Sequence, residues 1–156
     1  MSEEMTTTTN AGEILQYIDI TLGNEQYGID IRFVDNIVRI QQITRVPKSQ
    51  PYYVGVINLR GEVVPIMSIR KKFELEDDMY DNATRIIIVR LEDQSKIGVI
   101  VDEVKEVVNI DPAEIEKPAF KLDEKNAAYL AGIGKKGDQL ISLLDIQAVL
   151  DDKKEA

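Results

Sequence analysis

The stretch YGIDIRFVDNIVRI, residues 27–40, decides the fold because a second version of it occurs further along the chain. That second copy is IGVIVDEVKEVVNI, residues 97–110, at a constant offset of 70 positions. Matching positions carry glycine or an aliphatic side chain in both copies: Gly28 and Gly98, Ile29 and Val99, Ile31 and Val101, Val34 and Val104, Ile37 and Val107, Val38 and Val108, Ile40 and Ile110. A repeat of this kind predicts two structural units built on one plan.

A second pair of segments extends the repeat. YVGVINLRGEVVPIMSI (53–69) matches YLAGIGKKGDQLISLLDI (129–146), with Gly61 on Gly137 and one inserted residue after the turn that brings Ile66 to Leu143. The chain therefore divides into similar halves at about 13–75 and 83–150. The acidic stretch ELEDDMYDN (74–82) joins them.

Each half reads as a set of short strands. In ILQYIDITL (14–22) apolar and polar residues alternate, and GVINL and EVVPIMSI flank a turn in which Gly61 supplies the positive φ. Val34, Ile37 and Val38 fit either a helical turn or a third strand. About five strands in each half predict a small closed barrel, and such a barrel is too small to be stable alone. We expect a mainly β fold in which two five-stranded barrels share an apolar seam.

Two short helices are expected in the second half. In DPAEIEKP (111–118) Asp111 is placed as the N-cap and Pro112 as the first residue of a one-turn helix. DIQAVLDDKK (145–154) has the apolar spacing of a longer C-terminal helix.

Composition excludes several classes of function. The 156 residues include no cysteine and no histidine, which removes zinc-finger patterns and the usual nucleophile–base pairs of hydrolases. A formal net charge of −9 disfavours binding to nucleic acid and to anionic lipid. We expect a cytoplasmic protein without cofactor, metal or direct membrane insertion, with disordered ends at 1–12 and 151–156. An enzyme stays possible as a third alternative, but it would have to use carboxylates, lysine or tyrosine.

Two motifs that invite a chemical interpretation have simpler ones. The acidic residues of 74–81 lack the spacing of a calcium loop and are interpreted as a solvated linker. GIGKKGD (132–138) opens a strand rather than a helix, so it is interpreted as the second hairpin turn and not as a phosphate loop.

NLRGEVVPI (58–66) places an arginine at the apex of an otherwise apolar hairpin. Arg60 could be a solvated turn residue, or it could be a fork of donors that a rigid tip offers to a partner. By themselves, Val34 and Ile37 fit a place in the core better than a place in a binding groove.

Three segments resemble the CheW family of bacterial chemotaxis coupling proteins: NEQYGIDIRFVDNI (24–37), GVINLRGEVVPIMSIRKKF (55–73) and IGVIVDEVKEVV (97–108). The resemblance covers about residues 13–150. It implies two five-stranded SH3-like barrels and a non-catalytic scaffold that bridges the cytoplasmic tip of methyl-accepting receptors and the regulatory domain of the histidine kinase CheA. It also implies recruitment from the cytoplasm to membrane-associated receptor arrays.

The same resemblance implies the site residues. Those expected at the receptor are Val34, Asn36, Ile37, Asn58, Leu59, Arg60 and Gly61, and Gly55 is expected at the kinase. Many family members carry glutamate where this chain has Asn36, so a charged contact made by relatives is in doubt here. A receptor helix would lie in an apolar groove, with Val34 and Ile37 as anchors and Arg60 at the rim.

Two other functions stay open. The chain could be the coupling module of a CheV-type protein or of the kinase itself. It could also be a barrel that binds a small molecule or peptide and has no part in chemotaxis. A deep apolar cavity inside one barrel would favour the latter, and shallow surface grooves would favour the adaptor.

Overall fold

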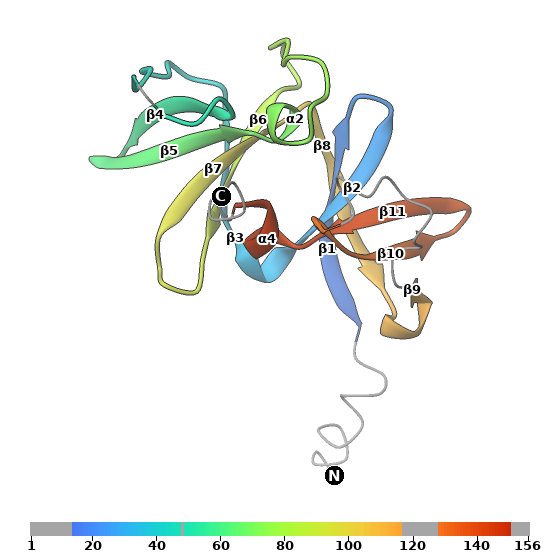
Figure 1. The fold of residues 1–156 in the computed structure, drawn as a ribbon. Helices are drawn as coiled ribbons and strands as arrows, with labels where there is room; N and C mark the ends of the chain where they lie inside the picture. Colours follow the sequence, from blue (N-terminus) through green and yellow to red (C-terminus); the bar gives the residue numbers. More distant parts are fainter. Residues whose placement is uncertain (1–13, 48, 117–127, 151–156) are drawn as a thin grey trace.

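The computed structural model describes residues 14–47, 49–116 and 128–150. The ends predicted to be disordered, 1–12 and 151–156, lie outside these ranges. Two twisted sheets pack side by side, and residues of two short helices contribute to the apolar cluster between them (Figure 1). The mainly β prediction is confirmed.

The two sheets have the following spatial orders. Sheet A contains β8 (Glu103–Ile110), β1 (Leu15–Leu22), β2 (Glu25–Asp30), β11 (Gln139–Leu144), β10 (Leu130–Lys136) and β9 (Ile115–Glu116). Sheet B contains β3 (Val34–Arg39), β6 (Arg85–Arg90), β7 (Lys96–Val101), β5 (Glu62–Ser68) and β4 (Tyr53–Leu59). The helices are α2 (Ile69–Lys72), α4 (Ile146–Val149) and two 3-10 turns, Ile31–Phe33 and Pro112–Glu114.

The sequence repeat reappears in the order of the strands. Replacing β8, β1, β2, β11 and β10 by their repeat counterparts gives β3, β6, β7, β5 and β4, which is sheet B. The parallel pairs agree residue by residue, because Leu143 lies opposite Gly28 and Ile66 lies opposite Gly98. A Cβ at Gly98 would come within 2.7 Å of Ile66 Cδ1, and one at Gly28 within 2.9 Å of Leu143 Cδ2. The repeated glycines therefore make room for the repeated aliphatic residues.

The sheets do not coincide with the halves 13–75 and 83–150. Sheet B is built from the continuous segment 34–101, whereas sheet A combines 15–30 with 103–144. The first hairpin of each half pairs with the later strands of the other half, through the parallel pairs β2–β11 and β7–β5. The sequence repeat is sequential and the structural units are interleaved, so the predicted subdomain boundaries do not describe the barrels.

Each sheet closes into a barrel in the same way. The chain after edge strand β3 returns to the opposite edge, where Thr44 and Val56 exchange two backbone hydrogen bonds of 2.8 Å. The chain after β8 does the same through β9, where Ile115 lies opposite Gly134 of β10. Closure of this kind leaves each barrel with little exposed edge.

Apolar side chains form three clusters. The interior of barrel B contains Ile57, Val64, Ile66, Ile86, Ile88 and Ile100. The interior of barrel A contains Tyr17, Val108, Ile110, Ile141 and Leu143. The largest cluster joins the outer faces of the two sheets and includes Ile20, Leu22, Ile29, Met67, Ile87, Val89, Val99 and Ile146. This third cluster is the predicted apolar seam.

Some local predictions need correction. Val34, Ile37 and Val38 belong to strand β3, which settles the choice left open. Asp111 does cap a single 3-10 turn, its carboxylate accepting from the amide of Ala113. The expected longer C-terminal helix is described only as the four residues of α4. In the described part of the chain, no helix has the length and apolar composition that a membrane span requires.

Candidate functional site

Arg60 lies in the two-residue turn between β4 and β5. Its φ is 57° and that of Gly61 is 83°, the pair of positive values that a type I′ turn requires. The Asn58 carboxamide oxygen accepts a hydrogen bond of 2.9 Å from the amide of Gly61 and holds the turn. Gly61 has the positive φ that the sequence predicts. Arg60 has a positive φ as well, although its Cβ makes that conformation unfavourable.

The equivalent turn of barrel A carries glycine at that position. In barrel A Gly132 lies opposite Leu143, and in barrel B Gly55 lies opposite Ile66. Both hairpins have two-residue turns, so neither turn contains an inserted residue. Gly137, with φ of 62°, therefore corresponds to Arg60 and not to Gly61. The insertion expected from the sequence is not present in this hairpin, because Tyr53 lies opposite Met67 as Leu130 lies opposite Leu144. Arg60 therefore adopts a positive φ at the position where the equivalent hairpin of barrel A has glycine.

The neighbours of Arg60 shape the turn. Leu59 is half-buried and packs against the interior cluster of barrel B, whereas Arg60 and Gly61 are exposed. Of the four residues expected from this segment, Asn58 and Arg60 have exposed side chains, and Arg60 is the charged one at the tip of the turn. Asn58 and Leu59 support it.

The other expected residues lie on β3, an edge strand of sheet B. Val34 is half-buried against the seam cluster, and the Asn36 side chain accepts a 2.8 Å hydrogen bond from the amide of Ile37. Ile37 is 36% exposed and lies opposite Ile87, a fully buried residue of the seam. Ile37 is thus an exposed aliphatic side chain at the margin of the apolar seam.

A chain of ion pairs links β3 to the hairpin. A bulge between Val34 and Asn36 leaves Asp35 free to reach Arg90 and Lys96, the latter at 3.6 Å. Lys96 also pairs with Glu62, the residue after Gly61, at 3.3 Å. The structure thus brings the β3 residues and the hairpin tip to one end of barrel B. Sequence analysis missed this link, because a bulge and a pairing across 34 positions leave no local pattern.

Gly55 has a structural role of its own. It is buried, its φ is 154°, and a Cβ there would come within 2.2 Å of the Thr44 carbonyl oxygen. The glycine permits the close approach that closes barrel B. Contact with a kinase stays a prediction for this residue.

Comparison with known proteins identifies the family. The model of the CheW-like domain matches residues 16–154. The chain belongs to the CheW-like family. It is 37% identical to the chemotaxis protein CheW of Helicobacter pylori, over 88% of this chain and 82% of that one. For the CheW of Bacillus subtilis the identity is 35%, over 94% and 92%. The crystal structure of the scaffolding protein TtCheW from Thermoanaerobacter tengcongensis superposes with a TM-score of 0.80 at 32% identity, covering 88% of both chains.

This CheW-like protein is accordingly a chemotaxis coupling protein and not an enzyme. Its barrel interiors agree with an adaptor, since Ile66, Ile86, Ile88 and Ile100 fill the inside of barrel B and are fully buried. Two surface cavities in the described part of the chain have volumes of about 270 and 240 Å³. The first is lined by 45–47, 49–51, 53–54 and Lys71, and the second by Arg70 and residues around it. Neither is a deep apolar chamber within a barrel, the feature that would favour a small-molecule site.

Arginine is unevenly distributed over the CheW-like fold. All seven arginines of the chain lie between positions 32 and 90, within barrel B or the connection that leads into it, although the net charge is −9. Arg60, Arg39 and Arg90 are exposed near Ile37 or the hairpin. This end of barrel B combines an exposed aliphatic side chain with arginine, the residue type suited to bidentate contacts with carboxylates.

Proposed function

We propose that this CheW-like protein couples the cytoplasmic tip of methyl-accepting chemotaxis receptors to the regulatory domain of the histidine kinase CheA. It would do so on the cytoplasmic side of membrane-associated receptor arrays. The observation that carries the proposal is Arg60, which keeps an unfavourable positive φ where the equivalent hairpin has glycine. Strained backbone at an exposed turn persists where the side chain has a function.

The receptor surface comprises Arg60, Ile37 and the ion pairs that join them through Asp35, Lys96 and Glu62. A receptor helix would lie along β3, with Ile37 as apolar anchor and Arg60 on carboxylates or helix-end carbonyls. Such an interface is small and therefore weak. Arrays would gain strength because many weak contacts act together.

The alternative of a CheV-type protein has less support. The chain is 24% identical to CheV3 of Helicobacter pylori, against 37% identity to CheW of the same organism. The coupling role is shared by both kinds of protein, so the receptor surface would serve either.

Isothermal titration calorimetry with the regulatory domain of the histidine kinase of the same organism tests the proposal. Saturable one-to-one binding that persists at moderate salt supports coupling. Absence of binding at high micromolar concentrations would contradict the kinase half of the proposal and leave the family and the fold as they are.

A further inference from the structure

The two barrels are joined by two short connections within residues 14–116. The chain leaves barrel A after β2 and enters barrel B through Ile31–Phe33, and it returns from β7 to β8 through Asp102. The repeat offset relates these connections, since it places position 32 on position 102. Any preferred orientation of one barrel against the other must be held near these points or within the seam.

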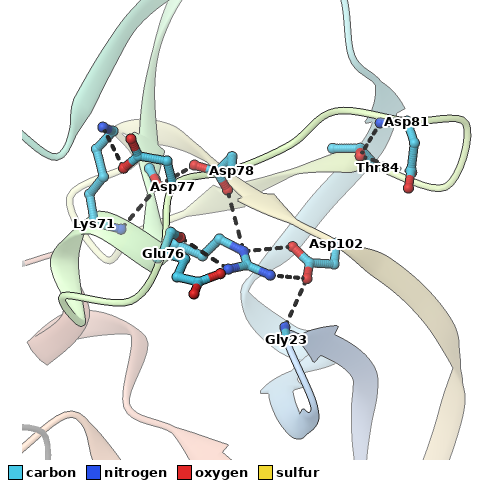
Figure 2. Close-up of polar contacts among 10 residues, drawn as sticks. Gly23, Lys71, Glu76, Asp77, Asp78, Asp81, Thr84 and Asp102 are labelled. Carbon is cyan, nitrogen blue, oxygen red and sulfur yellow. Dashed lines mark hydrogen bonds and ion pairs between the residues drawn. The ribbon is translucent and has the colours of Figure 1, made fainter.

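Asp102 is bound from both sides. One carboxylate oxygen accepts a 3.0 Å hydrogen bond from Arg70 Nε, and the other accepts 2.6 Å from Arg70 Nη2 and 2.8 Å from the amide of Gly23 (Figure 2). Its own amide donates to the carbonyl of Thr21 at 3.0 Å. Arg70 belongs to α2 of barrel B, while Thr21 and Gly23 belong to the first hairpin of barrel A. Asp102 therefore ties the two barrels together in a fixed geometry.

The guanidinium of Arg70 also contacts groups other than Asp102. Its Nη1 donates 3.0 Å to the carbonyl of Glu76, and its Nε lies 4.0 Å from Asp78, whose side chain is 7% exposed (Figure 2). Asp78 accepts a hydrogen bond from the buried hydroxyl of Ser68. Most of the acidic segment is exposed, as expected of a solvated linker, but the Glu76 carbonyl and the Asp78 side chain contact Arg70. The guanidinium has little freedom to take another position.

The other connection is built differently. Arg32 stands at the position equivalent to Asp102, is 75% exposed and pairs with Asp30 within the same connection at 2.7 Å. Gln147 of α4 stands where α2 has Arg70, because Ile146 corresponds to Ile69. The residue types of the Arg70–Asp102 pair are therefore not repeated. The pair breaks the internal symmetry on one side of the seam.

We infer that Arg70 and Asp102 are positioning residues that fix the orientation of the two barrels, and with it the position of barrel A relative to Ile37 at the margin of the seam. Apolar contacts in the seam are non-directional and admit small sliding movements. A bidentate guanidinium–carboxylate pair is directional and selects one arrangement. The consequence for receptor binding rests on the proposed function, whereas the orientation itself does not.

The orientation can be measured directly, because the chain contains no cysteine. Glu92→Cys in the β6–β7 turn and Asp138→Cys in the β10–β11 turn place one spin label on each barrel at exposed positions. Pulsed electron spin resonance then gives the distribution of distances between the barrels. Arg70→Gln and Asp102→Asn are each expected to broaden that distribution about twofold. Arg85→Gln, whose guanidinium donates to the carbonyls of the nearby Asn82 and Thr84, is the control expected to leave it unchanged.

Receptor binding gives the second readout. Arg70→Gln should weaken binding of a receptor cytoplasmic-tip fragment about tenfold while circular dichroism shows both barrels folded. A distribution as narrow as that of the wild type in both Arg70→Gln and Asp102→Asn would overturn the inference and leave the coupling proposal intact. If Arg70→Gln fails to fold, Asp102→Asn alone decides, since asparagine keeps the shape of the side chain and removes its charge. Broadening with unchanged receptor affinity would refute the positioning role.

Discussion

Arg60 and Gly137 occupy the same position in two equivalent hairpins, with φ of 57° and 62°. Glycine adopts such values without steric cost, whereas a residue with a Cβ is disfavoured there by about 1–2 kcal/mol. The hairpin of barrel A has the residue that the backbone favours. The hairpin of barrel B has arginine at the same point, which is exposed and makes the turn less stable than it could be.

Replacing Arg60 by glycine should separate stability from function. Arg60→Gly relieves the strained φ but adds freedom to the unfolded chain, so the free energy of unfolding should stay level or rise by up to about 1 kcal/mol. Binding of the receptor tip should fall sharply, as it should in Arg60→Ala. Urea denaturation and calorimetric titration measure the two effects. A large loss of stability in Arg60→Gly would show that the arginine is structural.

Ile37 and Val107 form a matched pair for testing the apolar anchor. They are repeat counterparts on the edge strands β3 and β8, with exposures of 36% and 47%. Ile37→Ser should cost about 1 kcal/mol of stability or less and weaken receptor binding, because the side chain is a contact and not a core residue. Val107→Ser should have the same small cost and bind receptor normally. Equal binding by both variants would remove Ile37 from the receptor surface.

Gly55→Ala should disturb the fold before it disturbs any contact. The new Cβ would meet the Thr44 carbonyl oxygen at 2.2 Å, which backbone cannot accept without reopening the barrel. We expect a loss of more than about 2 kcal/mol in the free energy of unfolding. Gly61→Ala, whose Cβ meets nothing within 4 Å, should cost only about 1 kcal/mol. If Gly55→Ala is as stable as wild type but fails to bind kinase, Gly55 acts at the interface as the family resemblance implies.

Asp19 gives the fold a measurable pH dependence. Asp19 lies opposite Gly28 in barrel A, and Ile88 lies opposite Gly98 at the corresponding place in barrel B. Barrel A therefore has a carboxylate where barrel B has a fully buried isoleucine. Asp19 is 2% exposed, and within the described residues its Oδ1 has no hydrogen-bond partner. Burial, reinforced by the nearby charge of Glu106, raises the pKa of Asp19.

Because the pKa of Asp19 is raised in the folded state, its carboxylate destabilises the fold increasingly as the pH rises from the unfolded-state pKa to the folded-state pKa. Below the unfolded pKa of about 3.9 the cost is absent. Asp19→Asn, which can still accept from Gln26, should therefore be more stable than wild type by about 1–2 kcal/mol at neutral pH. The advantage should disappear near about pH 3. Thermal unfolding across this range provides the check, and an advantage independent of pH would mean that charge is not the cause.

The repeat predicted much of this structure. It indicated the strand types, the glycines at 28 and 98 and the shared seam, because each depends on a local apolar pattern. It could not indicate that each first hairpin pairs with the other half. That choice depends on parallel pairing between strands far apart in the chain, and the same local patterns are compatible with either arrangement.

Of the candidate site, the sequence indicated the residues but not their connections. Asp35 reaches Lys96 only because of a bulge, and Asp78 is buried only because Ser68 and Arg70 lie beside it. A run of carboxylates such as 74–81 looks uniform in sequence. Its members differ in the fold because tertiary partners select which one is buried.

Coupling itself is tested most directly by co-sedimentation. Vesicles bearing a methyl-accepting receptor of the same organism are mixed with the histidine kinase CheA, with or without this protein, and the kinase that sediments is measured. We expect the kinase to sediment when the wild-type protein is present, and much less with Arg60→Ala although that variant is folded. Kinase that sediments to the same extent whether or not the protein is added would contradict the coupling proposal.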